Sequence, residues 1–352
     1  MVILGQHNVE PYVEKRLQKI RAFRRGEIVN IVEVTDYSNA NFIFRVTLST
    51  AAGRRVFFLK QAQRYNKRAL RLGEKISVEP SRMLGEHRML TLLRRLWGLA
   101  HVPEVIFFDR ANHIIALSDV SVGKKLLVDE FAAGRTHPEL GALFGTLFGR
   151  LHATTYGTRQ EYAGSRQWKK QLFKILVRQY WGSGVQRYFS AHRVNEFLRQ
   201  SSAATPSAIW GDPVYRNIFV NRQSLSCIDF DHASTADPAF DNGIFLAHWL
   251  WMAVKGSKAL TYDAEQFIRQ YVAAYRRALT AVNVPSEDIT GIMRRTARWA
   301  GYYLISRTDG RSGSYFRQWP LWEQGVRQLG IDLFGERYRT AASRRLALLF
   351  TS

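Results

Sequence analysis

Cysteine and long hydrophobic runs are both nearly absent from this chain of 352 residues. Its single cysteine, Cys227, excludes an internal disulfide framework and is typical of a reducing compartment. The longest apolar run, GIFLAHWLWMAV, has about a dozen residues, whereas a membrane-spanning helix needs about 20. The opening residues, MVILGQHNVEPYVEKRL, meet charge too early for a secretory signal. We therefore expect a soluble, cytoplasmic protein in which Cys227 is a buried strand residue.

Acidic residues are also scarce: 29 Asp and Glu stand against 51 Lys and Arg, which gives a formal net charge of +22. Such an excess attracts anionic partners, but it does not distinguish a nucleotide from a nucleic acid, an acidic metabolite or an anionic membrane. Basic residues recur at near-helical spacing in KKQLFKILVRQYW, IMRRTARW, RTDGRSGSYFRQW and GERYRTAASRRLALLF. Each stretch alone indicates a solvated helix face, and together they make RNA or another polyanion a candidate partner.

Internal repeats and long Pro/Gly/Ser-rich linkers are missing as well, and 46% of the residues are apolar. The chain can therefore bury one large core or two smaller ones. Residues 9–25 have helical periodicity. The segments EIVNIVEVTD, NFIFRVTLS and RRVFFLKQA predict three antiparallel strands, and VIFFD and HIIALSD predict two more. Between these two groups, Pro80 and Ser81 mark the start of a helix, SRMLGEHRMLTLLRRLWGL.

From about residue 131 the pattern becomes mostly helical. We therefore predict an α+β protein with two lobes. An N-terminal helical extension (1–28) precedes a small lobe with an antiparallel sheet and one main helix (29–118), and a hinge (119–130) leads to a helical lobe (131–352).

One stretch of the helical lobe, WGDPVYRNIFVNRQSLSCIDFDHAS, contains two short apolar runs that predict two short strands forming a hairpin, and polar residues lie beside both runs. Asp212 and Asn217 precede the first run, and Asp229 and Asp231 follow the second. Carboxylate and amide oxygens are the ligands that hard divalent cations prefer. Because residues two apart in an extended segment face the same side, Asp229 and Asp231 are expected to act together. The stretch therefore predicts a site for a divalent cation and a phosphate.

These motifs and the order of the elements resemble the protein-kinase-like phosphotransferases, in particular the aminoglycoside phosphotransferase and choline kinase branch. WGDPVYRNIFV is similar to that branch's catalytic loop, His-Gly-Asp, four residues, then Asn, and CIDFDHASTADPAFDNG is similar to its metal motif. The resemblance covers about residues 30 to 250 and implies the bilobal protein-kinase-like fold, with ATP and Mg²⁺ as cofactors. Trp210 departs from it, because relatives keep His at this position.

The resemblance also implies roles for the residues of this stretch. Asp212 would accept or orient the proton of the acceptor hydroxyl, and Asn217 and Asp229 would bind magnesium, with Asp231 as a second metal contact. Asp241 would brace the catalytic loop through its backbone. His152, in FGRLHATTYG, is expected to be a packed structural residue.

On the nucleotide side, Lys60 matches the strand lysine that contacts the α- and β-phosphates. Glu86 matches the helix glutamate that pairs with it, and Glu79 is its rival. Two further sets of residues are implied: a polar loop over the phosphates, Ser38, Asn39 and Asn41, and hinge positions for adenine, Ser118, Asp119 and Val120.

The first lobe further resembles methylthioribose kinase, through SNANFIF and FLKQAQRYNKR. The leading hypothesis is an ATP-dependent kinase for a hydroxyl of a small molecule such as a sugar, an aminoglycoside or an amino alcohol. Arg294, Arg295 and Arg298 are candidates to clamp an acidic group of that substrate, or form a solvated helix face. A kinase acting on RNA or an RNA-associated partner, and a nucleotide-binding regulatory pseudokinase, are the alternatives. The oligomeric state is expected to be a monomer or a homodimer.

Overall fold

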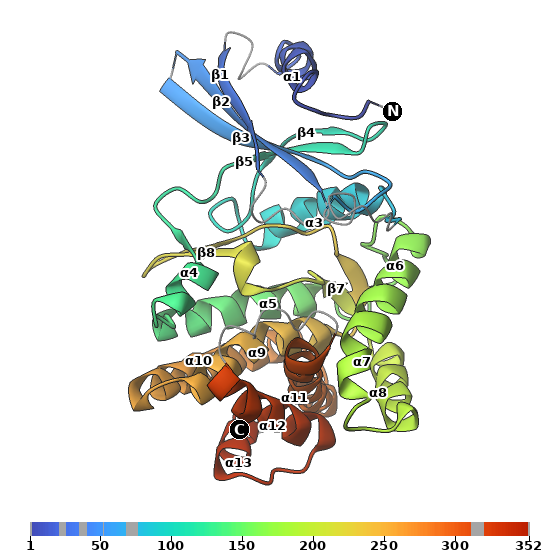
Figure 1. Cartoon of the computed structure of the whole chain (residues 1–352), viewed down its shortest axis with the longest axis vertical. Helices are drawn as coiled ribbons and strands as arrows, with labels where there is room; N and C mark the ends of the chain where they lie inside the picture. Colours follow the sequence, from blue (N-terminus) through green and yellow to red (C-terminus); the bar gives the residue numbers. More distant parts are fainter. Residues whose placement is uncertain are drawn as a thin grey trace.

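The structure is a computed structural model, and it describes residues 2–20, 26–34, 41–51, 53–67, 77–310 and 320–350. Two lobes follow each other along the long axis of the molecule: a sheet lobe at the N-terminal end and a helical lobe that ends at the C-terminus (Figure 1). The predicted α+β organisation, with an antiparallel sheet first and helices after it, is confirmed.

The small lobe is built on one five-stranded sheet, in the order β1-β2-β3-β5-β4, with every neighbouring pair antiparallel. Its strands are β1 (Glu27–Glu33), β2 (Phe42–Thr50), β3 (Gly53–Gln61), β4 (Val105–Asp109) and β5 (Ile114–Ser118). All five were predicted within a few residues, because each is rich in Val, Ile or Phe and bounded by polar turns.

Two helices cover the two faces of this sheet (Figure 1). Helix α1 (Val9–Leu17) buries Val9, Val13 and Leu17, which share one helix face, in a core that also contains Ile114 and Ala116. The alternate residues of β5 instead join the larger core, to which the buried face of α3 (Arg82–Leu96) belongs. Helix α1 ends at Leu17, short of the predicted residue 25, and residues 21–25 lie outside the described part of the chain.

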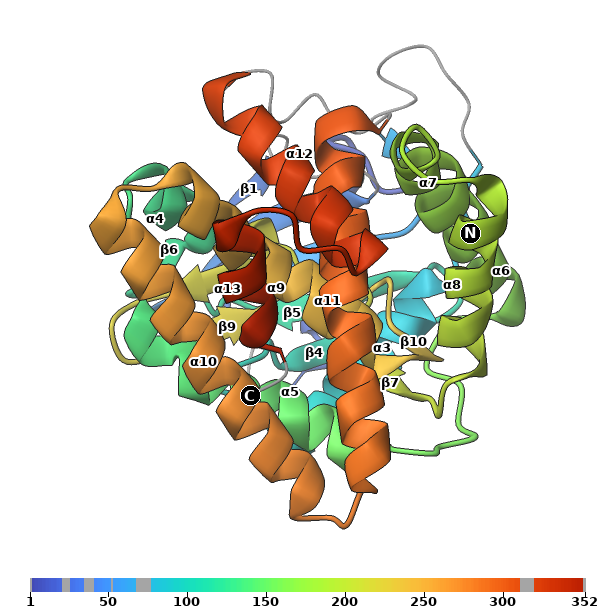
Figure 2. The same ribbon diagram turned by 90° about the horizontal axis from the view of Figure 1, so that it is seen from below.

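The helical lobe wraps further helices around one aromatic core. Its α-helices are α4 (Leu127–Ala132), α5 (Gly141–Thr154), α6 (Arg166–Leu172), α7 (Gly182–Val185), α8 (Ala191–Ala203), α9 (Pro238–Lys255), α10 (Lys258–Thr280), α11 (Ser286–Asp309), α12 (Pro320–Gly335) and α13 (Ala341–Leu348). A π-helical segment, η3 (Phe173–Trp181), joins α6 to α7, and η2 (Pro138–Leu140) precedes α5. Within the core, the rings of Trp249 and Phe267 stack with their centroids 3.8 Å apart. Figure 2 shows α10 and α11 diverging from the turn that joins them.

Two small sheets lie between the lobes' main elements and carry the polar stretch of the sequence (Figure 1). One contains β6 (Lys125–Leu126), β8 (Ile218–Val220) and β9 (Leu225–Cys227), and the other pairs β7 (Ser207–Ile209) with β10 (Ser234–Ala236). The hairpin β8–β9 is confirmed, and Cys227 lies buried in it, where burial raises the pKa of its thiol. Strands β7 and β10 were not predicted, because three residues are too few to show a period.

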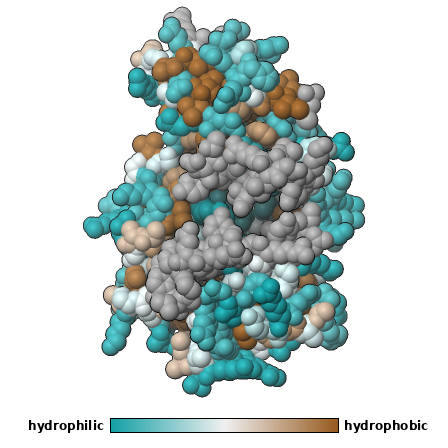
Figure 3. Space-filling model, viewed as in Figure 1, coloured by the Kyte–Doolittle hydropathy of each residue, from teal (hydrophilic) through white to brown (hydrophobic). Residues whose placement is uncertain are grey.

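The described surface in Figure 3 is mostly hydrophilic, and its hydrophobic residues gather at the end formed by the sheet lobe. Among the described helices, none has both the length and the apolar composition required to cross a bilayer.

Candidate active site between the lobes

The loop from β7 to β8 turns sharply at Gly211 and is held by hydrogen bonds to a residue of α9. Gly211 has a φ of 87°, and a Cβ here would lie 2.2 Å from the carbonyl oxygen of His232, so a side chain does not fit. The buried carboxylate of Asp241, near the N-terminus of α9, accepts hydrogen bonds from the N–H groups of Trp210 (2.6 Å) and Gly211 (2.8 Å). The predicted brace is therefore confirmed. It holds the next residue, Asp212, in a defined position.

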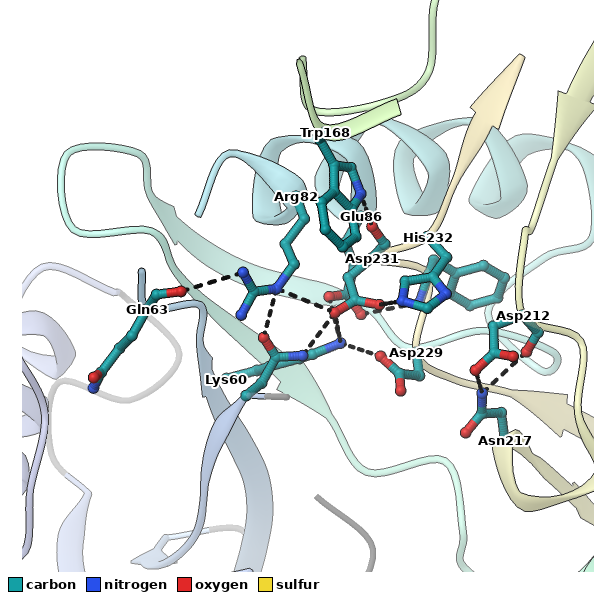
Figure 4. A network of polar contacts seen from close by, with 12 residues as sticks. Lys60, Gln63, Arg82, Glu86, Trp168, Asp212, Asn217, Asp229, Asp231 and His232 are labelled. Carbon is teal, nitrogen blue, oxygen red and sulfur yellow. Dashed lines mark hydrogen bonds and ion pairs between the residues drawn. The ribbon is translucent and has the colours of Figure 1, made fainter. Parts of the chain in front are cut away.

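Asp212 and Asn217 are coupled by hydrogen bonds across this loop. The turn η4 (Tyr215–Asn217) places the side chain of Asn217 next to Asp212. Asn217 Nδ2 donates hydrogen bonds to the Asp212 carbonyl at 3.0 Å and to the Asp212 carboxylate at 3.3 Å (Figure 4). With its nitrogen used in this way, the amide oxygen of Asn217 is the atom with which it can bind a cation.

Lys60 connects the two lobes through carboxylates. It lies buried on β3, and its Nζ is 2.7 Å from Oε2 of Glu86, which lies fully buried on α3. The same Nζ hydrogen-bonds to the carboxylate of Asp229 and is 3.8 Å from Oδ2 of Asp231 (Figure 4). The rival glutamate, Glu79, instead accepts a hydrogen bond from the backbone of the α3 N-cap. The pairing of Lys60 with Glu86 is thus present.

The electrostatics of this cluster follow from burial and from its crowded carboxylates. Burial lowers the pKa of Lys60, but Asp229, Asp231 and Glu86 together raise it, so the ammonium stays charged. Burial raises the pKa of Glu86 to about 7 against the effect of Lys60. It also raises the pKa of Asp229, with the charge of Asp231 adding to the effect. The pKa of Asp231 shifts in the opposite direction. Burial raises this pKa, but the charges of Lys60, His232 and Arg82 outweigh burial and lower it.

A buried arginine, Arg82, is a central part of the site that the sequence did not reveal. Its Nε donates a hydrogen bond to Asn41 Oδ1 at 3.0 Å and lies 3.6 Å from Oδ2 of Asp231. Asn41 Nδ2 in turn donates to Asp231 Oδ2 at 2.7 Å, so Asn41 bridges Arg82 and Asp231. The guanidinium lies 5.9 Å from the ring centroid of Trp168, whose indole N–H donates to the Asp231 carbonyl (Figure 4). An arginine in the first turn of a helix is ordinarily solvated, so nothing in the local pattern marks this one as buried.

The contacts among Arg82, Asn41 and Asp231 determine which polar atoms of Asn41 and Asp231 remain able to bind a ligand. The side chain of Asn41 is buried and engaged with Arg82 and Asp231, whereas Ser38 and Asn39, the other predicted residues of the phosphate loop, lie outside the described residues. The extended backbone expected around Asp229 is wrong, because its φ is 65°. Its side chain is 38% exposed and that of Asp231 only 5%. Asp229 is therefore the more accessible carboxylate for a cation.

The predicted hinge positions join β5 to the helical lobe. The N–H of Ser118 donates to the Glu104 carbonyl at 3.0 Å, and the carbonyl of Val120 accepts from Ser226 Oγ at 3.1 Å. Asp119 accepts hydrogen bonds from Ser121 and so fixes the turn. An adenine at this position would have to use the remaining backbone groups of the segment.

The three arginines proposed to clamp the substrate lie on α11, and each is engaged with side chains of the helical lobe. Arg294 pairs with Glu336, Arg295 Nε donates to Asp237 at 2.7 Å, and the guanidinium of Arg298 lies 4.3 Å from the ring centroid of Phe197. A different arginine of the same helix, Arg307, lines a pocket.

This pocket lies between η4, α9 and α11 and is partly open to solvent. Its described lining consists of Tyr215, Arg216, Ala247, His248, Trp251, Tyr303, Leu304 and Arg307. Two of these residues, Tyr215 and Arg216, belong to η4, and the next residue of that turn, Asn217, hydrogen-bonds to the carboxylate of Asp212. The pocket therefore lies beside Asp212. The sequence did not mark it, because its residues come from three separate segments.

The donor set fits a cation that is shared with a phosphate ligand. Among the described residues, no three His, Cys, Asp or Glu side chains are arranged to hold a metal by themselves. Mg²⁺ ordinarily takes only one or two carboxylates from the protein and completes its shell with water and phosphate oxygens. The exposed carboxylate of Asp229 and the amide oxygen of Asn217 satisfy that requirement.

Comparisons with known proteins agree with this fold. Solved structures that share it include choline kinase from Cryptosporidium parvum Iowa II (10% identity, TM-score 0.52, covering 97% of this chain and 99% of that one) and a microcompartment-associated aminopropanol kinase (15% identity, TM-score 0.51, covering 96% and 99%). They also include the amicoumacin kinase hAmiN in complex with AMP-PNP, Ca²⁺ and Ami (14% identity, TM-score 0.50, covering 92% and 93%). A search of curated protein sequences finds no significant match. Residues 45–283 match the family described as the phosphotransferase enzyme family. Because this match spans more than half of the 352 residues, the chain belongs to that family.

Proposed function

We propose that this phosphotransferase is an ATP- and Mg²⁺-dependent kinase that transfers the γ-phosphate to a hydroxyl group of a small molecule. The observation that carries the proposal is the buried network in which Lys60 of the sheet lobe contacts both Glu86 and Asp229. A lysine held this way is positioned to meet phosphate oxygens beside a cation-binding carboxylate. The pocket beside Asp212 supports a small acceptor, since its lining includes residues of the η4 turn that carries Asn217 and brings polar and aromatic side chains together near the proposed base.

Each residue has a defined task in this reaction. Mg²⁺, held by Asn217 Oδ1 and the Asp229 carboxylate, would supply neutralisation of the phosphate charge. Lys60 Nζ, now paired with Asp229 and Glu86, would contact the α- and β-phosphates, with Glu86 keeping its orientation. Because phosphoryl transfer passes through a loose transition state, aligning the groups and balancing their charge is most of what the protein must do.

Asp212 is the group that acts on the acceptor. Its carboxylate would orient the attacking hydroxyl and receive its proton, as the bond to the γ-phosphorus forms and the bond to the leaving ADP oxygen breaks. Asn217 and the backbone brace from Asp241 hold that carboxylate in place. The acceptor hydroxyl therefore has to reach Asp212 from the adjoining pocket.

The experiment compares Asp212→Asn with the wild-type protein in two measurements. ADP formation is followed with sugars, sugar acids, amino alcohols, aminoglycosides and total RNA as acceptors, and binding of a non-hydrolysable ATP analogue with Mg²⁺ is followed by thermal shift. We expect the substitution to reduce phosphoryl transfer by roughly 10²- to 10⁴-fold and to leave Mg²⁺-dependent nucleotide binding in place.

A matched control is Asp129→Asn, which removes an exposed carboxylate from α4 and is expected to change neither measurement. Undiminished ADP formation by Asp212→Asn would refute the assignment of the base. Nucleotide binding without any acceptor-dependent ADP formation would favour the regulatory pseudokinase.

A further inference from the structure

The pocket beside Asp212 has a charge that is opposite to the one an amine substrate requires. Arg216 and Arg307 both line it, and none of the described lining residues is a carboxylate. Arg216 precedes Asn217 in η4, and Arg307 comes from the last turns of α11, so the two cations approach from different elements. A site for a cationic acceptor would instead contain carboxylates to offset the substrate's charge.

Arg307 is held in position by an aromatic neighbour. Its Nη2 donates to the hydroxyl of Tyr303 at 2.7 Å, and its guanidinium carbon lies 4.6 Å from the centroid of the same ring. Burial lowers the pKa of Arg307, but Tyr303 and Asp212 raise it, so the group keeps its charge. A positioned guanidinium is suited to binding a carboxylate or phosphate, since its donors form a fork that matches two oxygens.

Two aromatic residues of the pocket, Tyr303 and Tyr215, already contact other side chains of the protein, which leaves them less able to bind an ammonium group. Aromatic rings hold such groups through cation–π contacts, which need an open ring face. Arg307 already lies over Tyr303, and the ring of Tyr215 packs against His248 with centroids 4.6 Å apart. The protein's own cation therefore already covers the ring of Tyr303, which a choline-like group could otherwise contact.

His248 adds a hydrogen-bond acceptor to the two cations. It is only 3% exposed and lines the pocket, and its Nδ1 lies 3.2 Å from the Phe245 carbonyl. Because a carbonyl only accepts, Nδ1 must carry the proton, and Nε2 is then an acceptor. Nε2 is buried and has no hydrogen-bond partner among the described residues. Burial lowers the pKa of His248 to about 3, with Arg307 and Arg216 contributing, so the ring is neutral.

We infer that the acceptor is an anionic hydroxylated molecule, in which a carboxylate or phosphate group binds Arg216 and Arg307 while hydroxyl groups face Asp212 and His248 Nε2. This inference rests on the kinase activity proposed above and specifies its substrate class. It excludes choline-like and aminoglycoside acceptors, because their positive charge would be buried beside two arginines.

The test uses acceptors that share a carbon skeleton and differ in charge: gluconate, glucose 6-phosphate, glucose and glucosamine, with kanamycin and choline as cationic probes. ADP formation and thermal stabilisation in the presence of the ATP analogue and Mg²⁺ are measured for each. We expect gluconate or glucose 6-phosphate to exceed glucose in both measurements and the cationic probes to give neither. The two anions tell whether the pocket takes a carboxylate or a phosphate.

Variants then locate the effect. We expect Arg307→Gln and Arg216→Gln each to raise KM for the anionic acceptor by roughly 10- to 100-fold, with KM for ATP unchanged. Arg307→Lys should recover part of the loss, because it keeps the charge. The control is Arg344→Gln, which removes an exposed arginine from α13.

Three outcomes overturn the inference while leaving the kinase proposal standing: preference for a neutral or cationic acceptor, stabilisation by glucose that equals that by both gluconate and glucose 6-phosphate, or a rise in KM for ATP that matches the rise for the acceptor. The last would place the arginines on the nucleotide phosphates. Failure of the kinase proposal itself has a different signature, since anions would still stabilise the protein through Arg307 but no probe would give ADP.

Discussion

The indole N–H of Trp210 donates a hydrogen bond to the backbone carbonyl of Asp229, at 2.9 Å. This hydrogen bond joins the loop that carries Asp212 directly to the loop that carries Asp229, the carboxylate that we propose to bind the cation. The Trp210 ring is fully buried and stacks on Phe230, with centroids 4.9 Å apart. Tryptophan therefore braces the site at the position where the resemblance led us to expect histidine, and it does so with one donor and a large packing surface.

Replacing Trp210 by Phe tests this brace. The change removes the donor and leaves the part-buried Asp229 carbonyl without this partner, which should lower the free energy of unfolding by about 1 kcal/mol. Because Asp229 is then less firmly held, we also expect a lower kcat and a higher Mg²⁺ concentration for half-maximal activity. Chemical denaturation and a magnesium titration of activity measure the two effects.

The matched control is Trp97→Phe. The indole of Trp97 is also buried and donates to a backbone carbonyl, that of Leu147, at 2.7 Å. A similar loss of stability is expected there, with no change in the magnesium dependence. If both variants shifted the magnesium titration equally, the link between Trp210 and the cation site would be refuted.

Arg82 is expected to be among the residues on which stability depends most. It neutralises Asp231 and also donates to the carbonyls of Gln63 and Glu79. Substituting Met keeps the volume roughly similar but leaves Asp231 buried with one cation fewer, and breaking a buried pair in this way costs about 3–5 kcal/mol. Arg88→Met, on the same helix, removes a part-buried arginine that donates to the Ala163 carbonyl and should cost far less. Equal losses in urea denaturation would contradict the role given to Arg82.

The close approach of α5 and α10 yields a prediction about two glycines. A Cβ on Gly145 would lie 2.2 Å from the Tyr271 carbonyl oxygen, so the helices would have to separate. We expect Gly145→Ala to destabilise the protein by about 3 kcal/mol, at the upper end for overpacking. Gly291→Ala, on α11, would meet only one side-chain atom, Nη1 of Arg295 at 3.1 Å, and should change the stability far less. Thermal unfolding measures both variants, and equal falls in Tm would refute the packing argument.

Local patterns sufficed for the parts of this molecule that are determined locally. The strands of the small lobe and the hairpin after Asn217 follow from apolar runs and turn residues. The pairing of Lys60 with Glu86 was implied only by the family resemblance, which left Glu79 as a rival. Contacts between segments that are distant in the sequence could not be predicted from local patterns. Asn41 meets Asp231 across 190 residues, and no period in the sequence indicates it.

The arginines illustrate the same limit. The sequence contains many arginines, and the three nominated on α11 were chosen for their clustering. Whether an arginine of α11 is buried depends on which face of that helix packs against a neighbouring element. The packing of α9 against α11 determines this face. The structure consequently places Arg307 in the pocket and Arg294 against Glu336 at the surface.

An ion-pair cluster away from the site should control stability in acid. The Glu130 carboxylate accepts two hydrogen bonds from Arg135, both at 2.6 Å, and lies 2.8 Å from His137 Nε2. These contacts, that of Arg135 foremost, lower the pKa of Glu130 to about 2.

Because the folded-state pKa of Glu130 lies below the unfolded value of about 4.3, its contribution to stability is complete above that value and is lost as the pH falls towards 2. Glu130→Gln should therefore be less stable than the wild type at pH 7, and the difference should shrink between about pH 4.3 and 2. Denaturation midpoints measured across this range test it. Glu139→Gln removes a more exposed carboxylate that contacts the same imidazole, and it should run parallel to the wild type. If the Glu130→Gln difference stayed constant down to pH 2, the carboxylate would not be titrating as its contacts require.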